Sequence, residues 1–333
     1  MKSLALFALS AIASASAFAL TPTPAINISG TSNQTTTVNS GATLKNVAAA
    51  RSTAIQDVSS NKGMIEIAGT SNQTTTLSSP AQVLNKSNNA GDIAIQNVSS
   101  NYASVTVKGG ATSNQTTTLT GGGLSNSATG AGGTSCGGVD CDDTAKAMQN
   151  VSSNAGNVTI EGHSNQTTWL NNTQVDNTAI GASAVAVQSL ASNTGKVDIK
   201  GTSNQTVDLK NATVTNFANG ANTTAVQNLA SNYDGVTVKG TSNQTVSGTG
   251  GTVYNEAVGV GSQAFQNLSS NFGNVMIAGT SNQTTSVSGT IWNMANGTGS
   301  LAIQNVSSND ACEPPKFKLP DCPTGYCWNT ARR

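Results

Sequence analysis

The chain has 333 residues, only 9% of them charged, and its 15 basic residues balance 15 acidic ones. An ordinary globular protein is about 25% charged, so this surface is poorly suited to bind nucleic acid or an anionic membrane, and we expect neither as a partner. A net charge near zero favours association with other protein surfaces instead.

The first 19 residues have the features of a secretory signal peptide. Lys2 supplies the positive charge, residues 4–13 form a short apolar run, and residues 17–19 read Ala-Phe-Ala, a small-x-small cleavage site. We expect the mature chain to begin at Leu20 and to be secreted, with residues 20–24 as a proline-containing lead. No later stretch approaches the roughly 20 apolar residues of a membrane-spanning helix.

One phrase of sequence recurs seven times between residues 25 and 309, which indicates a solenoid or stacked array. The marker is the Asn of a repeated Ser-Asn-Gln, and its copies lie 39, 42, 51, 39, 39 and 39 residues apart. The markers and the glutamines that follow them are Asn33, Gln34, Asn72, Gln73, Asn114, Gln115, Asn165, Gln166, Asn204, Gln205, Asn243, Gln244, Asn282 and Gln283.

Another glutamine recurs in the other half of the phrase, within Ala-Φ-Gln, where Φ is apolar. Its copies are Gln56, Gln96, Gln149, Gln188, Gln227, Gln266 and Gln304. From this glutamine to the next marker the spacing is nearly constant, whereas the other half varies in length and is expected to be exposed loop. The third repeat carries an insertion near 131–143, which contains Cys136 and Cys141.

The constant half contains Val-x-Ile alternation, as at Ile65 and Ile67 or at Val275 and Ile277. A period of two with β-branched residues predicts a strand with one buried side. The glycine that follows, for example Gly279, indicates a corner. The Ala-Φ-Gln segment predicts a second strand, of which one face or both could be interior. We therefore predict an all-β fold, a β-solenoid or stacked cross-β array of seven repeats.

Identical amides in stacked layers can bond to the copies above and below, about 4.8 Å away. We predict that both glutamine sets and the marker asparagines form such ladders and serve in assembly. The two halves of the phrase both end in Ser-Asn, which favours two small rungs per repeat over one broad layer.

The segment 310–333 is rich in proline and is expected to act as a cap or a tether, because proline cannot donate to a strand ladder. It contains Cys312, Cys322 and Cys327, so five cysteines are disulfide candidates in an oxidising compartment. The odd count leaves one thiol without a partner in the chain.

Signals for chemistry are weak, and we expect no enzyme, no cofactor and no resident metal. His163 is the single histidine and lacks the partners of a triad or a metal cluster. Three acids in the insertion, Asp140, Asp142 and Asp143, are interpreted as solvated loop residues rather than a calcium site. The Asn-Gln-Thr segments match the N-glycosylation sequon, but the ladder explains their asparagines as well.

Paired threonines in the first three repeats, such as Thr35 and Thr37, offer an alternative hypothesis. Two hydroxyls on one face of each layer are typical of ice-binding β-solenoids. The pair becomes Thr167 and Trp169 in the fourth repeat and Thr206 and Asp208 in the fifth. The neighbouring amides remain constant, so stacking is the preferred explanation.

The repeat resembles those of bacterial functional amyloids. The run from Gly156 to Ile160 leading to Asn165-Gln166 is similar to the Gly-Asn and Asn-Gln segments of Fap fibre subunits, and the fixed Asn and Gln positions resemble curli repeats. The resemblance implies a secreted subunit that polymerises with itself into an extracellular fibre, biofilm or adhesive surface matrix, with a secretion pore or nucleator as a further partner. Alternatives are a capped monomer that binds ice or glycan, and a glycosylated eukaryotic wall or coat protein.

Overall fold

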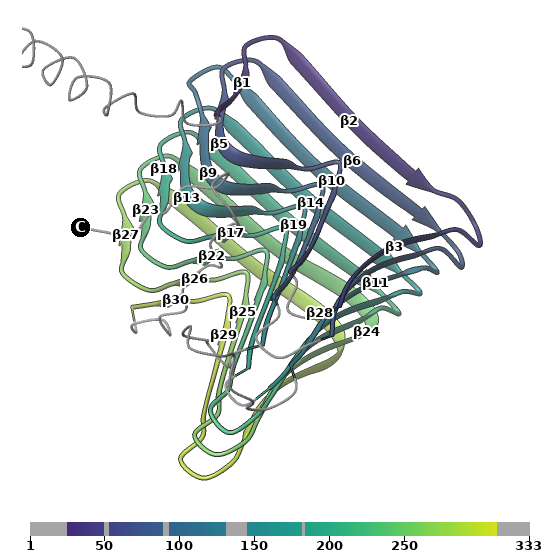
Figure 1. The fold of residues 1–333 in the computed structure, drawn as a ribbon. Helices are drawn as coiled ribbons and strands as arrows, with labels where there is room; N and C mark the ends of the chain where they lie inside the picture. The colour runs from purple at the N-terminus through teal and green to yellow at the C-terminus, as the bar shows by residue number, and fades with distance from the viewer. Residues whose placement is uncertain (1–24, 50–52, 89–92, 131–144, 182–183, 312–333) are drawn as a thin grey trace, which may run out of the picture.

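The structure is a computed structural model that describes residues 25–49, 53–88, 93–130, 145–181 and 184–311. The signal peptide, the insertion and the tail beyond residue 311 lie outside the described residues, as do all five cysteines. In the described part every element is a strand, and the strands stack into a parallel β-solenoid, which confirms the predicted fold class (Figure 1).

Each turn of the solenoid contributes strands at four positions, which form three sheets. The first position belongs to the 11-stranded sheet and comprises β1 (Ala25–Ile28), β5 (Asn61–Ile67), β9 (Asn101–Val107), β13 (Asn154–Ile160), β17 (Asn193–Thr194), β18 (Val197–Ile199), β22 (Asn232–Tyr233), β23 (Val236–Val238), β26 (Asn271–Phe272), β27 (Val275–Ile277) and β30 (Asn309–Asp310).

The 12-stranded sheet holds the second and third positions. The second comprises β2 (Thr31–Val38), β6 (Thr70–Ser78), β10 (Thr112–Thr120), β14 (His163–Asn171) and β19 (Thr202–Lys210). The third comprises β3 (Thr43–Ala48), β7 (Gln82–Ser87), β11 (Gly123–Thr129), β15 (Gln174–Ile180) and β20 (Thr213–Asn219). Two long strands, β24 (Thr241–Val258) and β28 (Thr280–Asn296), cover both positions.

The fourth position forms the seven-stranded sheet: β4 (Ala54–Val58), β8 (Ile93–Val98), β12 (Lys146–Val151), β16 (Val185–Leu190), β21 (Thr224–Leu229), β25 (Gln263–Leu268) and β29 (Leu301–Val306). In β8 five of the six residues are buried, and the same pattern occurs in β12, β16, β21 and β25. Both faces of this sheet are therefore interior.

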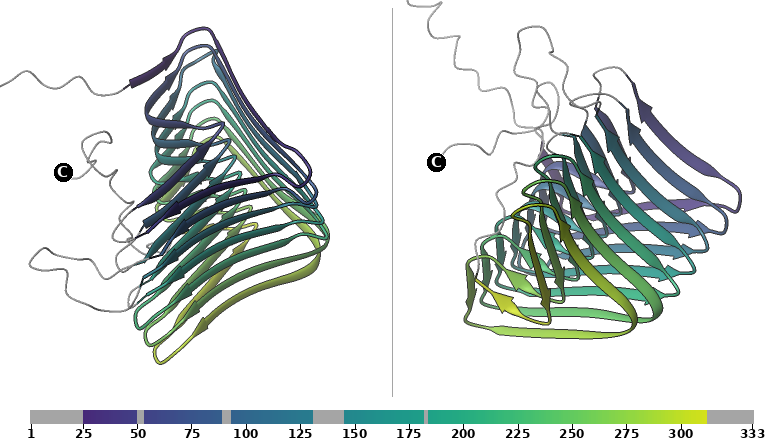
Figure 2. Two further views of the ribbon diagram at one scale, coloured as in Figure 1. Left: turned by 45° about the vertical axis from the view of Figure 1, so that its right-hand side comes forward. Right: turned by 90° about the horizontal axis from the view of Figure 1, so that it is seen from below.

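Each repeat forms one broad layer, so the prediction of two small rungs was wrong. Every strand pairs in parallel with the strand at the same position one repeat later, so that Asn72 lies opposite both Asn33 and Asn114. The two similar halves of the phrase do not stack on each other, because they lie on different sides of one turn (Figure 2).

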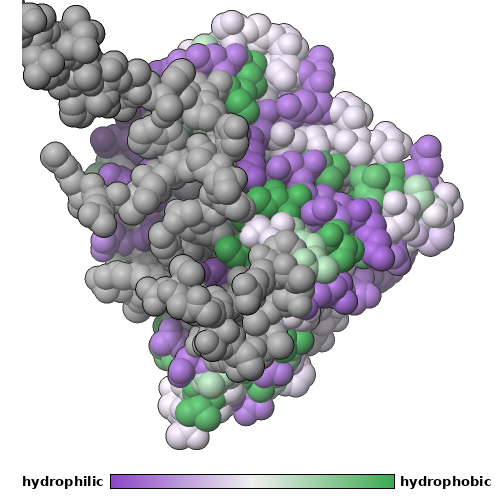
Figure 3. Space-filling view, in the orientation of Figure 1, coloured by the Kyte–Doolittle hydropathy of each residue, from purple (hydrophilic) through white to green (hydrophobic). Residues whose placement is uncertain are grey.

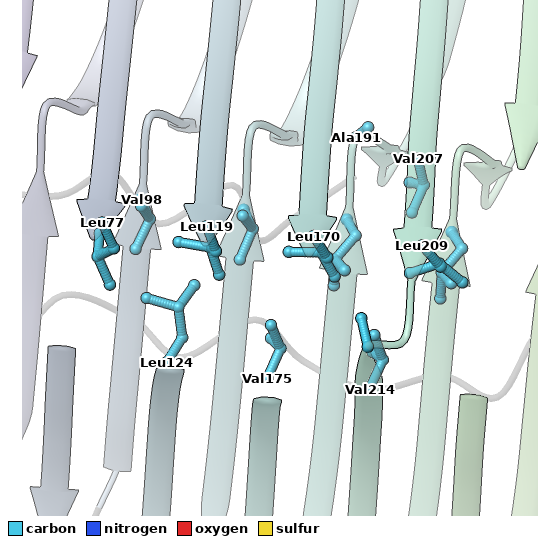
Figure 4. Close-up of a cluster of buried hydrophobic side chains, with 14 of the residues drawn as sticks. Leu77, Val98, Leu119, Leu124, Leu170, Val175, Ala191, Val207, Leu209 and Val214 are labelled. Atoms are coloured by element: carbon cyan, nitrogen blue, oxygen red, sulfur yellow. The ribbon is translucent and has the colours of Figure 1, made fainter. Parts of the chain in front are cut away.

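A column of Leu and Val side chains fills the space between the second, third and fourth positions (Figure 4). Leu77, Leu119, Leu170 and Leu209 are members of it and are almost completely buried. The predicted alternation at the first position is also observed, since Ile65 and Ile67 are buried and Glu66 between them is exposed. Aliphatic columns of this kind supply most of the driving force for stacking the layers.

The half of the repeat that was expected to be loop contains a strand, the third position of each turn. The largest difference in length between repeats falls after that strand, between Thr129 and Lys146. A difference of one residue lies before it, where β24 and β28 shift register between Thr249 and Gly251. The largest variation in length therefore marks the connection after the third strand.

Candidate functional site

A ladder of glutamine amides runs through the fourth position of all seven turns. The amide of Gln96 donates to Gln56 Oε1 at 2.9 Å, and Gln149 donates to Gln96 at 2.8 Å. The same bond repeats from Gln188, Gln227, Gln266 and Gln304, each to the preceding layer. We call this set the Gln56 column.

These amides also bond across the layer. The Nε2 atom of Gln188 donates to the carbonyl oxygens of Val175 at 3.2 Å and Thr215 at 3.1 Å in the facing strands. One buried side chain thus connects two sheets within the layer and two layers along the stack. Burying the amide is tolerated because each polar atom has a partner.

The marker asparagines form a second ladder, the Asn33 column, on the outer face of the 12-stranded sheet. Asn72 Nδ2 donates to Asn33 Oδ1 at 2.8 Å, and each later marker donates to the preceding one in the same way. The inner members are half-buried, whereas Asn33 and Asn282 at the two ends are exposed.

The glutamines that follow the markers do not bond to their own copies. Gln73 Nε2 instead donates to Asn101 Oδ1 at 3.1 Å and to the Ser100 carbonyl oxygen at 3.3 Å. The arrangement repeats in the other turns, and several of the Oε1 atoms in this set, including that of Gln166, are buried without a partner among the described residues. Gln34, Gln73, Gln115, Gln166, Gln205, Gln244 and Gln283 therefore tie one column to another rather than form a ladder.

Two further asparagine ladders were missed by the sequence reasoning. The Asn61 column joins Asn61, Asn101, Asn154, Asn193, Asn232, Asn271 and Asn309. The Asn46 column joins Asn46, Asn85, Asn126, Asn177, Asn216, Asn255 and Asn293. The Asn61 column could have been recognised in the sequence, because its asparagine ends a Ser-Ser-Asn or Ala-Ser-Asn segment in every repeat. The asparagines of the Asn46 column all lie near the middle of the third strand of their turn, and this constant position could have revealed them.

Within a layer, the side chains of neighbouring columns are chemically matched, so that a serine hydroxyl of one column bonds to a threonine hydroxyl of the next. Ser99 Oγ donates to Thr75 Oγ1 at 2.8 Å, whereas the equivalent positions in a later turn hold Ala230 and Val207, both buried and apolar. In two turns the match fails. Val246 occupies the threonine position where Ser269 occupies the serine position, and Ser269 Oγ donates instead to the Thr284 carbonyl oxygen at 2.7 Å. In the other turn Thr168 occupies the threonine position but Ala191 the serine position. Thr168 Oγ1 is accordingly buried without a hydrogen-bond partner in the described part of the chain.

Replacing Thr168 by valine is expected to raise the free energy of unfolding by about 1 kcal/mol, because it removes a buried hydroxyl that has no partner. The matched control is Thr117→Val, which deprives Ser152 Oγ of its 2.8 Å partner and is expected to lower stability by a similar amount. Urea denaturation followed by circular dichroism measures both changes. Two changes of the same sign would contradict the matching of the columns.

The outer face of the 12-stranded sheet carries the paired threonines. Thr35 and Thr37 point outward with Asn33, and Thr74 and Thr76 lie opposite them one layer later. His163 is exposed at the start of β14 on this face. On the side seen in Figure 3, hydrophobic and hydrophilic residues of the described chain are interspersed.

A shallow pocket lies over the turns that precede β7, β11 and β15. Pro80, Gly122, Gln174 and Asp176 line it, and Asp176 is the only ionisable side chain among the lining residues. Burial raises the pKa of Asp176, opposed by hydrogen bonds from Thr215 and Gln174. A single carboxyl group with neutral neighbours does not form a general acid and base pair.

Within the described ranges no cluster of three or more His, Cys, Asp or Glu side chains is placed to hold a metal ion. The same ranges contain no helix with the length and apolar character required to cross a membrane.

Both ends of the stack are open in the described structure. The strands β1, β2, β3 and β4 each pair with one neighbour only, as do β27, β28, β29 and β30 at the opposite end (Figure 1). Side chains that are covered inside the stack are exposed there: Leu44 is 37% exposed and Val306 42%, whereas Val83 and Leu268 in the same columns are fully buried.

These features define the described part of the chain as a parallel β-solenoid with continuous amide ladders, whose first and last layers each pair on one side only. Comparison with protein-family models, curated proteins and solved structures finds no match for it.

Proposed function

We propose that the chain is a secreted structural protein that assembles with copies of itself into an extracellular fibre or surface matrix, with a structural or adhesive role. The observation that carries the proposal is the pair of open terminal layers, where backbone groups, amide ladders and aliphatic columns all stop without a partner in the described residues. Exposed strand edges of this kind are templates for pairing with another chain.

The composition supports the same proposal. A formal net charge of zero removes the repulsion that keeps many proteins monomeric. The amide columns make the exposed edges specific, because an added layer gains its hydrogen bonds only in the correct register.

Purified mature protein is expected to bind thioflavin and to give fibres with a cross-β reflection at about 4.8 Å, the spacing between stacked strands. Fibre diffraction and electron microscopy provide the measurement. A chain that remains monomeric at high concentration and shows neither property would contradict the proposal.

The second candidate function is binding of ice or of a flat glycan by the outer face of the 12-stranded sheet. It is supported by the outward threonines of β2, β6 and β10, which align in register. Its weakness is the exposed Trp169, together with Asp208, in the same column. A thermal-hysteresis measurement on the monomer distinguishes this candidate from the first.

The third candidate, a glycosylated wall protein, requires glycans on the marker asparagines. Nδ2 of each marker after Asn33 donates to the preceding layer, and a glycan on that nitrogen would interrupt the ladder. The mass of the secreted protein tests this candidate directly.

A further inference from the structure

We propose, as a consequence of the proposed function, that copies join head to tail only: the last layer of one copy receives the first layer of the next, in the register of the repeat. Asp57 is the mismatched rung of the amide columns at the junction itself and limits the rate of joining. Three features of the stack favour this junction: the direction of each ladder, the position around the axis at which the described spiral begins and ends, and the residues at its two ends.

The four continuous ladders have fixed and different directions. In the Asn33 and Gln56 columns each amide donates toward the N-terminal end of the stack, so that Asn33 and Gln56 have no preceding layer among the described residues to donate to. In the Asn46 and Asn61 columns each amide donates toward the C-terminal end. Each end of the stack thus carries a particular pattern of donors and acceptors.

The two patterns are complementary. Head-to-tail joining allows Asn33 to donate to Asn282 Oδ1 of the preceding copy, and Gln56 to donate to Gln304 Oε1. In the opposite direction Asn309 donates to Asn61 Oδ1 of the next copy. Asn293 donates likewise to Asn46 Oδ1, and all four ladders continue. Because a ladder of this kind has a direction, two identical ends cannot continue one another.

The described residues also begin and end at nearly the same position around the axis of the solenoid. Ala25 pairs with Met64 and belongs to the column that contains Ser104 and Asn157. Near the other end, Asp310 pairs with Phe272, which places Ala311 above Gly273. The next position of the spiral lies above Asn274 and is the one that Ala25 of a following copy would occupy. The described residues of a joined copy would therefore continue the spiral of the first copy.

One column has opposite charges at its two ends and none between them. It begins with Lys62, continues through uncharged residues such as Tyr102 and Phe272, and ends with Asp310. Head-to-tail joining sets the ammonium group of Lys62 against the carboxylate of Asp310, whereas joining two identical ends would set like charges together.

A glycine column shows how tightly the layers approach. A Cβ atom added to Gly69 would lie 2.1 Å from the Gly30 carbonyl oxygen of the preceding layer, and the equivalent distances at Gly201 and Gly279 are also 2.1 Å. Gly30 itself has nothing within 4 Å of such an atom, because none of the described residues forms a layer on that side of it. In the joined pair, Gly30 would lie next to Gly279 of the preceding copy.

At Asp57 the donors and acceptors of the two joined ends do not complement each other. Its column continues with Asn97 and Asn150, and Asn97 Nδ2 donates to Asp57 Oδ1 at 2.6 Å. At the other end of the column Asn305 donates to Asn267 and presents its Oδ1 to the next copy. The exposed carboxylate of Asp57 has no hydrogen to donate to that oxygen. This rung opposes joining, whereas an asparagine at position 57 would supply the missing donor at the junction. Inside the stack the same column is interrupted at Ser189, which lies between Asn150 and Asn228.

The first test is Gly30→Ala, with Gly109→Ala as the matched control. Gly109 also has nothing within 4 Å of an added Cβ atom but lies within the stack rather than at its end. Both variants are expected to unfold at the same urea concentration as wild type. In seeded elongation on wild-type fibres, Gly30→Ala is expected to be slower by about tenfold or more, since tenfold corresponds to only about 1.4 kcal/mol, while Gly109→Ala elongates normally.

The second test is Asp57→Asn, which keeps the acceptor for Asn97 and adds the missing donor. We expect a rate of elongation about tenfold higher than that of wild type, because one interface hydrogen bond replaces an opposed pair of acceptors. Asp208→Asn is the control, since it removes the same charge from an exposed position in an inner layer. Equal acceleration by both variants would show a general effect of charge and overturn the role of Asp57.

These outcomes separate the junction from the proposed function. Wild-type fibres on which Gly30→Ala and Gly109→Ala elongate equally would overturn the head-to-tail junction and leave the fibre in place. A wild-type chain that forms no fibre would overturn the proposed function, and with it the junction.

Discussion

Replacing Gly201 by alanine is expected to lower the free energy of unfolding by about 3 kcal/mol or more, the upper part of the range for overpacked sites. The added Cβ atom would lie 2.1 Å from the Gly162 carbonyl oxygen and 2.4 Å from that of Glu161. Both atoms belong to the backbone of the preceding layer. They can move away only if the two layers separate, which would disrupt the amide ladders at the same place.

Urea denaturation followed by circular dichroism measures the loss, and Gly109→Ala again serves as the control, because it makes the same chemical change into open space. The control is expected to stay within about 0.5 kcal/mol of wild type, as is usual for exposed sites. Equal midpoints for the two variants would contradict close packing as the reason for glycine at this corner.

The second large effect is expected from Gln188→Leu in the middle of the Gln56 column. The change removes the acceptor of Gln227 and the donor to Gln149, both bonded at 2.8 Å and buried. Each buried polar group left without a partner costs about 1 to 3 kcal/mol, so we expect a loss of about 3 kcal/mol or more. Because a solenoid is stabilised by contacts between nearest layers, the denaturation curve is expected to become less cooperative.

Gln304→Leu is the matched control for this change. Gln304 is exposed in the last layer and makes a single ladder bond, its donation to Gln266. Its replacement is expected to cost about 1 kcal/mol, the usual net value of one hydrogen bond. Similar losses in the two variants would show that the column does not act as a ladder.

Much of the fold was predictable from one sequence, because its seven repeats can be compared with one another. The constant spacing around Gln188 and the Val-x-Ile alternation at Val197 and Ile199 predicted strands and stacking correctly. The number of layers per repeat was predicted wrongly. Two similar half-phrases looked like two rungs, and only the observed pairing of Asn72 with Asn114 excluded that arrangement.

The third strand of each turn was missed for a different reason. Its residues, such as Asn85 and Asn126, belong to the half of the repeat that varies in length, and the whole half was assigned to loop. The largest variation lies in the connection that follows the strand. Spacing to the preceding marker, rather than to the following glutamine, would have located it.

The sequence by itself determined that each residue of the phrase faces its own copy one repeat away, because a parallel in-register stack requires the same chemistry at the same place in every layer. Only the tertiary structure decided which different columns meet inside a layer. Gln73 and Gln96 are equally constant, yet Gln73 reaches across the layer to Asn101 while Gln96 bonds to Gln56. That choice depends on how the turn folds back on itself, which is set by contacts between residues far apart in the chain.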